Sequence, residues 1–204
     1  MKNLIILLFL SFSCFAQTKL DTLVFNKIND YRVSKGLNKV SWDTVCFKAS
    51  KHHSEYLERK AFKTKYDTIT CGHEEKVSGF EHCWDRYGSY GGKLQSVGEI
   101  VETFNESYKD SEVSFLDRMA DSILVHWKNS SQHNAIILGV DFAFIGVSCV
   151  VIKRPVGLRG KTNYSVWSTC VFSGGGIKRD ITHVKSSKKK KKKGFRSFIN
   201  NLFK

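Results

Sequence analysis

The chain has 204 residues and a net charge of +14, from 33 Lys and Arg against 19 Asp and Glu. This length is sufficient for one domain with a hydrophobic core. Nine basic and no acidic residues fall in Lys185–Lys204, so residues 17–184 carry a net charge of only +4. This distribution argues against sequence-specific nucleic-acid binding, because a nucleic-acid-binding body would carry its basic residues on the folded surface.

Residues 1–16 have the pattern of a secretory signal peptide. Lys2 precedes a short apolar run, Leu4–Phe12, and Ala16 is a small residue at the end of the segment. The run is too short to cross a bilayer comfortably, since that takes about 20 residues. A retained membrane anchor and lipid modification of Cys14 are the less favoured alternatives. We expect cleavage after Ala16 and export to an oxidising compartment.

Five cysteines remain after this cleavage, namely Cys46, Cys71, Cys83, Cys149 and Cys170. Cysteines of exported chains commonly form disulfides. The midpoint between Cys149 and Cys170 falls at residues 159–160, in an expected turn, so antiparallel pairing would place the two directly opposite each other. We therefore predict a Cys149–Cys170 disulfide. Cys71 and Cys83 enclose a short loop and form the second predicted pair. Cys46 is expected to be a buried free thiol, and zinc binding by the cysteines is less favoured because no C-x-x-C motif exists.

Hydrophobic periodicity predicts helices early in the chain and strands late. The expected helices cover residues 20–36, 43–60 and 116–127, with a further turn of helix at 135–137. The expected strands cover residues 97–104 (a short strand or a turn), 144–153 and 164–172. Residues 64–92 read as a long structured loop of the kind that often carries function. This order predicts an α+β sandwich in which helices pack on a small antiparallel sheet.

Six short motifs follow one another in a fixed order along the chain. They are Asn29-x-x-Arg32-x-x-x-Gly36-Leu37, Trp42-Asp43 with Ala49, Gly72-His73, Gly98-Glu99, Trp127-x-x-Ser130-x-x-His133, and Phe144-Ile145-Gly146-Val147. The ordered series resembles the CAP superfamily, which comprises cysteine-rich secretory proteins, antigen 5, pathogenesis-related proteins and bacterial SCP-like proteins. The resemblance covers about Leu20 to Val171 and implies an α-β-α sandwich. The late motif resembles the bacterial form, so we expect a protein that is secreted or held in the periplasm or cell envelope of a bacterium.

The same resemblance implies that His73, Glu99 and His133 converge in one cleft. Ser130 stands where many animal and plant members have a second glutamate, and Ile100 replaces the asparagine that follows the first. Two imidazoles and a carboxylate could hold a divalent metal such as zinc with one position open, or could act as a general acid and base. A Ser130–His133 nucleophile and base pair is less favoured, because no buried carboxylate is evident to orient His133.

Each cleft residue also has a structural interpretation that the sequence leaves open. His73 could be an ordinary surface histidine, and His133 could interact with a helix dipole. Glu99 could fix a turn, and Ser130 could be a polar residue at a helix end. His52, His53, His82 and His126 remain unassigned.

The segment Lys185–Lys204 is the other distinctive feature. Lys188–Lys193 must be solvated, and the apolar residues after Gly194 form one stripe at helical spacing. A basic run followed by a short amphipathic helix favours an anionic membrane surface or an acidic polymer as partner. A solubilising tail without a partner is the alternative.

These patterns favour a secreted, non-enzymatic binding module for a small apolar ligand, a lipid or an envelope partner. A non-enzymatic role is favoured because the sequence offers no convincing nucleophile. The binding site would be the cleft lined by histidine and glutamate. One alternative is a hydrolase, with or without a metal, that uses the same cleft. The other is an envelope adaptor that acts mainly through its basic tail.

Overall fold

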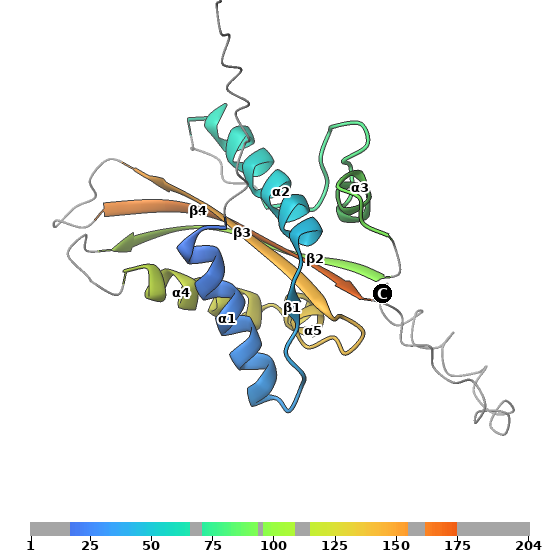
Figure 1. The fold of residues 1–204 in the computed structure, drawn as a ribbon. Coiled ribbons are helices and arrows are strands. Elements are labelled where there is room, and N and C mark those ends of the chain that lie inside the picture. Colours follow the sequence, from blue (N-terminus) through green and yellow to red (C-terminus); the bar gives the residue numbers. More distant parts are fainter. Residues whose placement is uncertain (1–16, 66–70, 94–95, 109–114, 155–161, 175–204) are drawn as a thin grey trace, which may run out of the picture.

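The fold was analysed in a computed structural model, which describes residues 17–65, 71–93, 96–108, 115–154 and 162–174. The predicted signal peptide and the tail Lys185–Lys204 lie outside the described residues. The described part forms an α+β sandwich with a four-stranded sheet in the order β1-β3-β4-β2 (Figure 1). None of the helices in these ranges is long and apolar enough to cross a membrane.

The sheet is mixed, with one parallel and two antiparallel pairings. Its strands are β1 (Ser41–Trp42), β2 (Ser96–Tyr108), β3 (Phe144–Lys153) and β4 (Thr162–Gly174). β4 pairs antiparallel with β3, as expected for the late hairpin, and it also pairs antiparallel with β2, while the short β1 pairs parallel with β3. The expected short strand or turn over residues 97–104 is a 13-residue strand that pairs with β4 along its whole length.

Helices cover both faces of this sheet. They are α1 (Lys19–Ser34), α2 (Thr44–Phe62), α3 (Cys83–Ser89), α4 (Phe115–Asn129) and α5 (Ser131–Ile137). α2 packs across β3 and β4 on one face, and α1 and α4 pack together on the other (Figure 1). The predicted α-β-α sandwich is therefore confirmed. α3, which lies between α2 and β2, was not expected and occupies part of the predicted loop 64–92.

Local sequence accounts for the ends of the long helices. The Thr18 side chain accepts a hydrogen bond from the Asp21 backbone N–H at 3.1 Å, and Asp21 accepts from the Thr18 N–H at 2.8 Å, which forms a capping box on α1. Gly36 follows α1 with φ of +74°, a left-handed conformation that favours glycine after a helix. The Asp43 carboxylate caps α2 by accepting from the Cys46 N–H at 2.6 Å.

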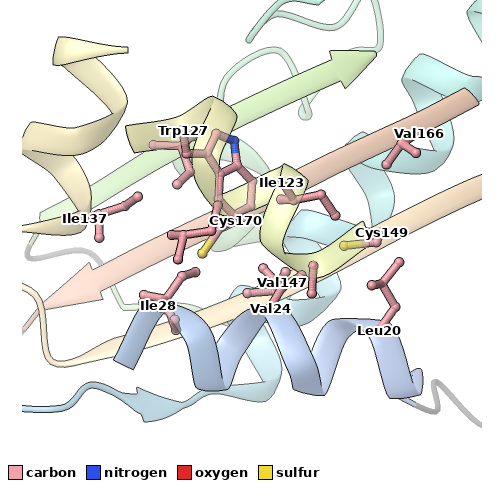
Figure 2. Close-up of a cluster of buried hydrophobic side chains, with 14 of the residues drawn as sticks. Leu20, Val24, Ile28, Ile123, Trp127, Ile137, Val147, Cys149, Val166 and Cys170 are labelled. Atoms are coloured by element: carbon pink, nitrogen blue, oxygen red, sulfur yellow. The ribbon is translucent and has the colours of Figure 1, made fainter. Parts of the chain in front are cut away.

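The main core lies between the sheet and the α1–α4 layer (Figure 2). Val24 and Ile28 of α1 meet Ile123 and Trp127 of α4 over Val147 of β3, and all five side chains are fully buried. On the opposite face, the α2 backbone lies against β3 at Gly146, where an added Cβ would overlap the backbone of Phe47. Helices therefore cover both faces of the sheet.

Neither predicted disulfide is formed in this structure, in which the five described cysteines are free. The β3–β4 register places Cys149 opposite Ser168 and Cys170 opposite Val147, so the strand pairing is displaced by two residues from the one that would align the two thiols. Both sulfur atoms lie in the main core (Figure 2). Cys71 is exposed with its Sγ 3.4 Å from the Val101 carbonyl, while Cys83 is buried at the start of α3.

Cys46 is a buried free thiol, as predicted. Its Sγ donates to Ser173 Oγ at 3.2 Å. Burial raises the pKa of this thiol far above its ordinary value, so Cys46 is an inert packing residue.

Candidate functional site

Glu99 on β2 is at the centre of a buried network of charged side chains. The Glu99 side chain is only 2% exposed, which is unusual for an ionisable group. Arg86 of α3 donates from Nη2 to Glu99 Oε2 at 2.6 Å, and His73 Nδ1 donates to Oε1 at 3.0 Å. A buried carboxylate is tolerated when it is paired and hydrogen-bonded in this way. Both oxygen atoms of Glu99 are thus engaged by this chain's own side chains.

A second carboxylate, Glu75, is completely buried beside the first. Arg86 Nη1 lies 3.3 Å from Glu75 Oε1, so one guanidinium contacts both carboxylates. His53 Nδ1 also approaches Glu75 Oε1, at 2.8 Å. The other oxygen of Glu75, Oε2, lies 3.2 Å from His52 Nε2, but the two atoms are not aligned for a hydrogen bond. Arg86 is therefore the residue that joins the two acidic groups.

His53 of α2 is fully buried and has two hydrogen-bond acceptors as neighbours. Its Nδ1 contacts Glu75 Oε1 at 2.8 Å and its Nε2 contacts the Gly72 carbonyl at 2.7 Å. Both ring nitrogens of His53 therefore face hydrogen-bond acceptors. His53 thus joins the buried carboxylate of Glu75 to the backbone at Gly72.

Both glutamates stay ionised in this network. Burial alone raises the pKa of Glu99, but the hydrogen bond from His73 and the charges of His53 and Arg86 outweigh it, so the net pKa is lowered. The pKa of Glu75 is lowered for similar reasons, since its interactions with His52 and His53 and the charge of Arg86 exceed the effect of burial. Neither carboxyl group is therefore placed to supply a proton near neutral pH.

Two histidines form the outer part of the site. The His73 side chain is 53% exposed, and because its Nδ1 is bound to Glu99, its Nε2 points away from the network. The His133 ring lies with its centroid 6.3 Å from that of His73 at an angle of 70°. Within the described part of the chain, buried Nδ1 of His133 has no hydrogen-bond partner. Burial and the charge of His73 lower the pKa of His133, although Glu102 opposes them, so this imidazole is neutral.

Ser130 is a helix cap. Its side chain accepts a hydrogen bond from the His133 backbone N–H at 3.4 Å at the start of α5. The three-residue spacing between Ser130 and His133 therefore reflects helix capping, which agrees with the reading of Ser130 as a polar residue at a helix end. This contact involves the backbone of His133, so it does not pair the hydroxyl group with the imidazole as nucleophile and base.

The predicted trio is brought together in part. His73 contacts both Glu99 and His133, while Glu99 is oriented toward Arg86 and the interior. Across the described ranges, no three or more His, Cys, Asp or Glu side chains are arranged to hold a metal ion. The residues present do not fit the predicted three-ligand zinc set, because both Glu99 oxygens are already hydrogen-bonded.

Sequence reasoning missed His53, Glu75 and Arg86. His53 lies on the buried face of α2, and a polar side chain among apolar neighbours at helical spacing is a signal of a buried network. Arg86 lies on α3, a helix too short for periodicity to reveal. One local signal existed there, because Asp85 accepts from the His82 N–H at 3.0 Å and stands three residues after it, as in a capping box.

Three long antiparallel strands, one short parallel strand and covering helices define a three-layer sandwich with a His-Glu site at one sheet edge. The family model of CAP, the Cysteine-rich secretory protein family, matches residues 25–172. The chain therefore belongs to the CAP family. A search of curated protein sequences found no match.

Two solved bacterial structures are similar in fold. An extracellular protein containing an SCP domain from Bacillus anthracis has 18% identity and a TM-score of 0.53 over 76% of this chain. An outer surface protein from Borrelia burgdorferi has 16% identity and a TM-score of 0.50, covering 78% of this chain and 96% of that one. The chain spans only 40% of the length of the Bacillus protein. At these identities the similarity concerns the fold.

Proposed function

We propose that this protein is an exported, non-enzymatic CAP-domain binding module whose ligand site is formed by His73 and His133. The observation that carries the proposal is the engagement of Glu99 by Arg86 and His73. A carboxylate that is ionised and fully hydrogen-bonded serves to orient the imidazole of His73, and it has no free oxygen for proton transfer. The site thus presents hydrogen-bonding groups in a fixed position without an activated nucleophile.

A lipid or another small amphipathic molecule suits the surroundings of the two histidines. Phe142 and Ile136 pack over Gly98, directly before Glu99, and both side chains are partly exposed. They supply apolar surface next to the β2 segment that carries Glu99, and the exposed imidazole of His73 can form a hydrogen bond with a polar head group. Ligand sites commonly combine an apolar lining with a few placed polar groups.

Fluorescent fatty-acid binding to the mature full-length protein tests this proposal. We expect His73→Ala and His133→Ala to weaken binding, and His126→Ala, which removes a partly exposed histidine of α4, to leave it unchanged. Equal binding by all three variants would contradict the proposed site.

The hydrolase alternative has its own test. It would be supported if the protein hydrolysed a short-chain ester and if this activity disappeared in His73→Ala and His133→Ala. Zinc titration of the same proteins would identify a metal requirement.

The tail Lys185–Lys204 supports a location at a negatively charged surface. Its nine basic residues and its apolar stripe suit an anionic membrane or an acidic polymer, and the apolar start of the chain suits signal-peptide cleavage near Ala16. In this proposal the folded domain leaves the cytoplasm and the tail retains it at the cell envelope.

A further inference from the structure

A shallow groove between α1 and β1 lies apart from the His-Glu network. The strand order places β1 at one edge of the sheet and β2, which carries Glu99, at the other (Figure 1). The volume of the groove is about 590 Å³. The lining residues that matter for its chemistry are Phe25, Asn26, Asp30, Lys39, Ser41 and Trp42. The groove is thus a second candidate site with its own set of residues.

Two aromatic side chains provide a rigid apolar surface in this groove. The rings of Phe25 and Trp42 lie 5.5 Å apart between centroids at an angle of 85°, and both side chains are partly exposed. The Trp42 ring also packs against Phe47, with ring centroids 5.3 Å apart, and its backbone is fixed by the pairing of β1 with β3. A fixed, half-exposed aromatic surface can bind an apolar face of a ligand at little entropic cost.

Polar side chains border the aromatic pair on both sides. Asn26 and Asp30 are separated by one helical turn, so they share one side of α1. Lys39 and Ser41 belong to the segment that leads into β1. All four residues are exposed in the fold. They offer amide, carboxylate, ammonium and hydroxyl groups around one small aromatic surface.

Buried Asn29 fixes the distance between the two walls. Its Nδ2 donates to the Val40 carbonyl at 3.0 Å, and its Oδ1 accepts from the Val40 N–H at 2.8 Å. These two bonds join the middle of α1 to the residue before β1. The groove therefore has a defined width that does not depend on a mobile side chain.

We propose that the α1–β1 groove binds a saccharide. A pyranose ring has an apolar C–H face, which suits the aromatic pair, and a border of hydroxyl groups, which suits the amide of Asn26 and the carboxylate of Asp30. A purely apolar ligand would leave these polar groups without water or partners. A strongly charged ligand would meet Asp30 and Lys39, which have opposite charges. A neutral polyhydroxylated ligand provides hydrogen-bond partners for the polar groups and carries no charge that either Asp30 or Lys39 would repel.

NMR titration of the ¹⁵N-labelled mature protein with chitotriose and with cellotriose, at millimolar concentrations, tests the proposal. We expect shifts of the backbone amides of Phe25, Asn26 and Asp30 and of the indole N–H of Trp42, while His73 and Glu99 remain unchanged. The absence of shifts at the groove with both saccharides would overturn the proposal, as would shifts confined to another surface.

Variants at exposed positions separate binding from folding. Asn26→Ala and Asp30→Ala should each raise the Kd by about threefold to tenfold, the usual effect of losing one hydrogen bond. Asn38→Ala replaces an exposed asparagine outside the groove, and Trp84→Phe alters an exposed tryptophan of α3, so neither should change the Kd. Equal weakening by Asn38→Ala would overturn the assignment. Because these tests leave the cleft around Glu99 unaltered, their outcome is independent of the proposed lipid site.

Discussion

Arg86 is the residue on which the buried network depends. One guanidinium contacts Glu75 at 3.3 Å and Glu99 at 2.6 Å, and it also donates to the carbonyl of His73 at 3.1 Å. Its loss would leave two buried carboxylates without the guanidinium that pairs with both of them. Pairing within this group is therefore a condition for folding as well as for the orientation of His73.

The change Arg86→Met tests this dependence. We expect a loss of about 3–5 kcal/mol in the free energy of unfolding, the usual cost of removing one partner of a buried ion pair. Arg59→Met is a matched control, because Arg59 is largely exposed and lies 3.8 Å from Glu55 on the same helix. Its expected effect is below about 1 kcal/mol. Urea denaturation of both variants provides the comparison, and similar losses would contradict the proposed role of Arg86.

The buried glutamates predict a specific dependence of stability on acid. The pKa values of Glu75 and Glu99 in the folded protein are lowered from the ordinary 4.5, so their contribution is present above about pH 4.5 and is lost as the pH falls through the folded values. His133 acts in the same direction from a higher pH, because its pKa is lowered from 6.5 and protonation therefore favours the unfolded chain.

Unfolding measurements across the acidic range check this dependence. Glu75→Gln should flatten the fall in stability with decreasing pH, whereas Glu74→Gln, which alters the exposed neighbouring carboxylate, should preserve the slope of the original protein. If the free energy of unfolding of Glu75→Gln and of the original protein fell in parallel with decreasing pH, the acid dependence would not arise from Glu75.

At the scale of elements, the contact between α2 and β3 depends on Gly146. An added methyl group there would overlap the Phe47 backbone, which cannot move without shifting the whole helix. We expect Gly146→Ala to destabilise the fold by at least about 1–3 kcal/mol. Gly88→Ala lies in α3 with open space around it, and should be neutral or slightly stabilising. Thermal unfolding of the two variants distinguishes them, and equal melting temperatures would contradict the close packing.

Much of the element order could be predicted from sequence because the long helices have clear periodicity and caps. The ends of α1 and α2 follow from Thr18, Gly36 and Asp43, which are local signals. The register of β3 and β4 could not be predicted in this way, because nothing in the two apolar stretches distinguishes a pairing at Ser168 from one at Cys170. The expected alignment of Cys149 with Cys170 rested on a register that the structure does not have.

The site was predictable only where a family motif marked it. His73, Glu99 and His133 were indicated by the resemblance, and in the structure His73 lies close to both of the other residues. Glu75 and Arg86 stand in a segment without periodicity, where burial arises from tertiary packing alone. Their pairing involves residues that are distant from Glu99 in sequence, so no local pattern could reveal it.

For the whole molecule, the distribution of charge predicts a separable role for the tail. Deletion of Lys185–Lys204 should greatly weaken co-sedimentation with vesicles that contain phosphatidylglycerol, since each lysine near an anionic surface contributes about 1 kcal/mol. Binding to neutral phosphatidylcholine vesicles should be weak for both forms. Full retention of binding after deletion would assign the membrane contact to the domain.

The pairing of β2 with β4 has a consequence for the order of events during biogenesis. Partner residues in this ladder are 54 to 78 positions apart in the chain, and β4 is an inner strand flanked by β2 and β3. The sheet on which the earlier helices pack is therefore incomplete until β4, which ends at Gly174, is available for pairing. Such non-local closure slows folding, so we expect the β2–β4 pairing to be completed late in folding, a delay that suits the proposed export.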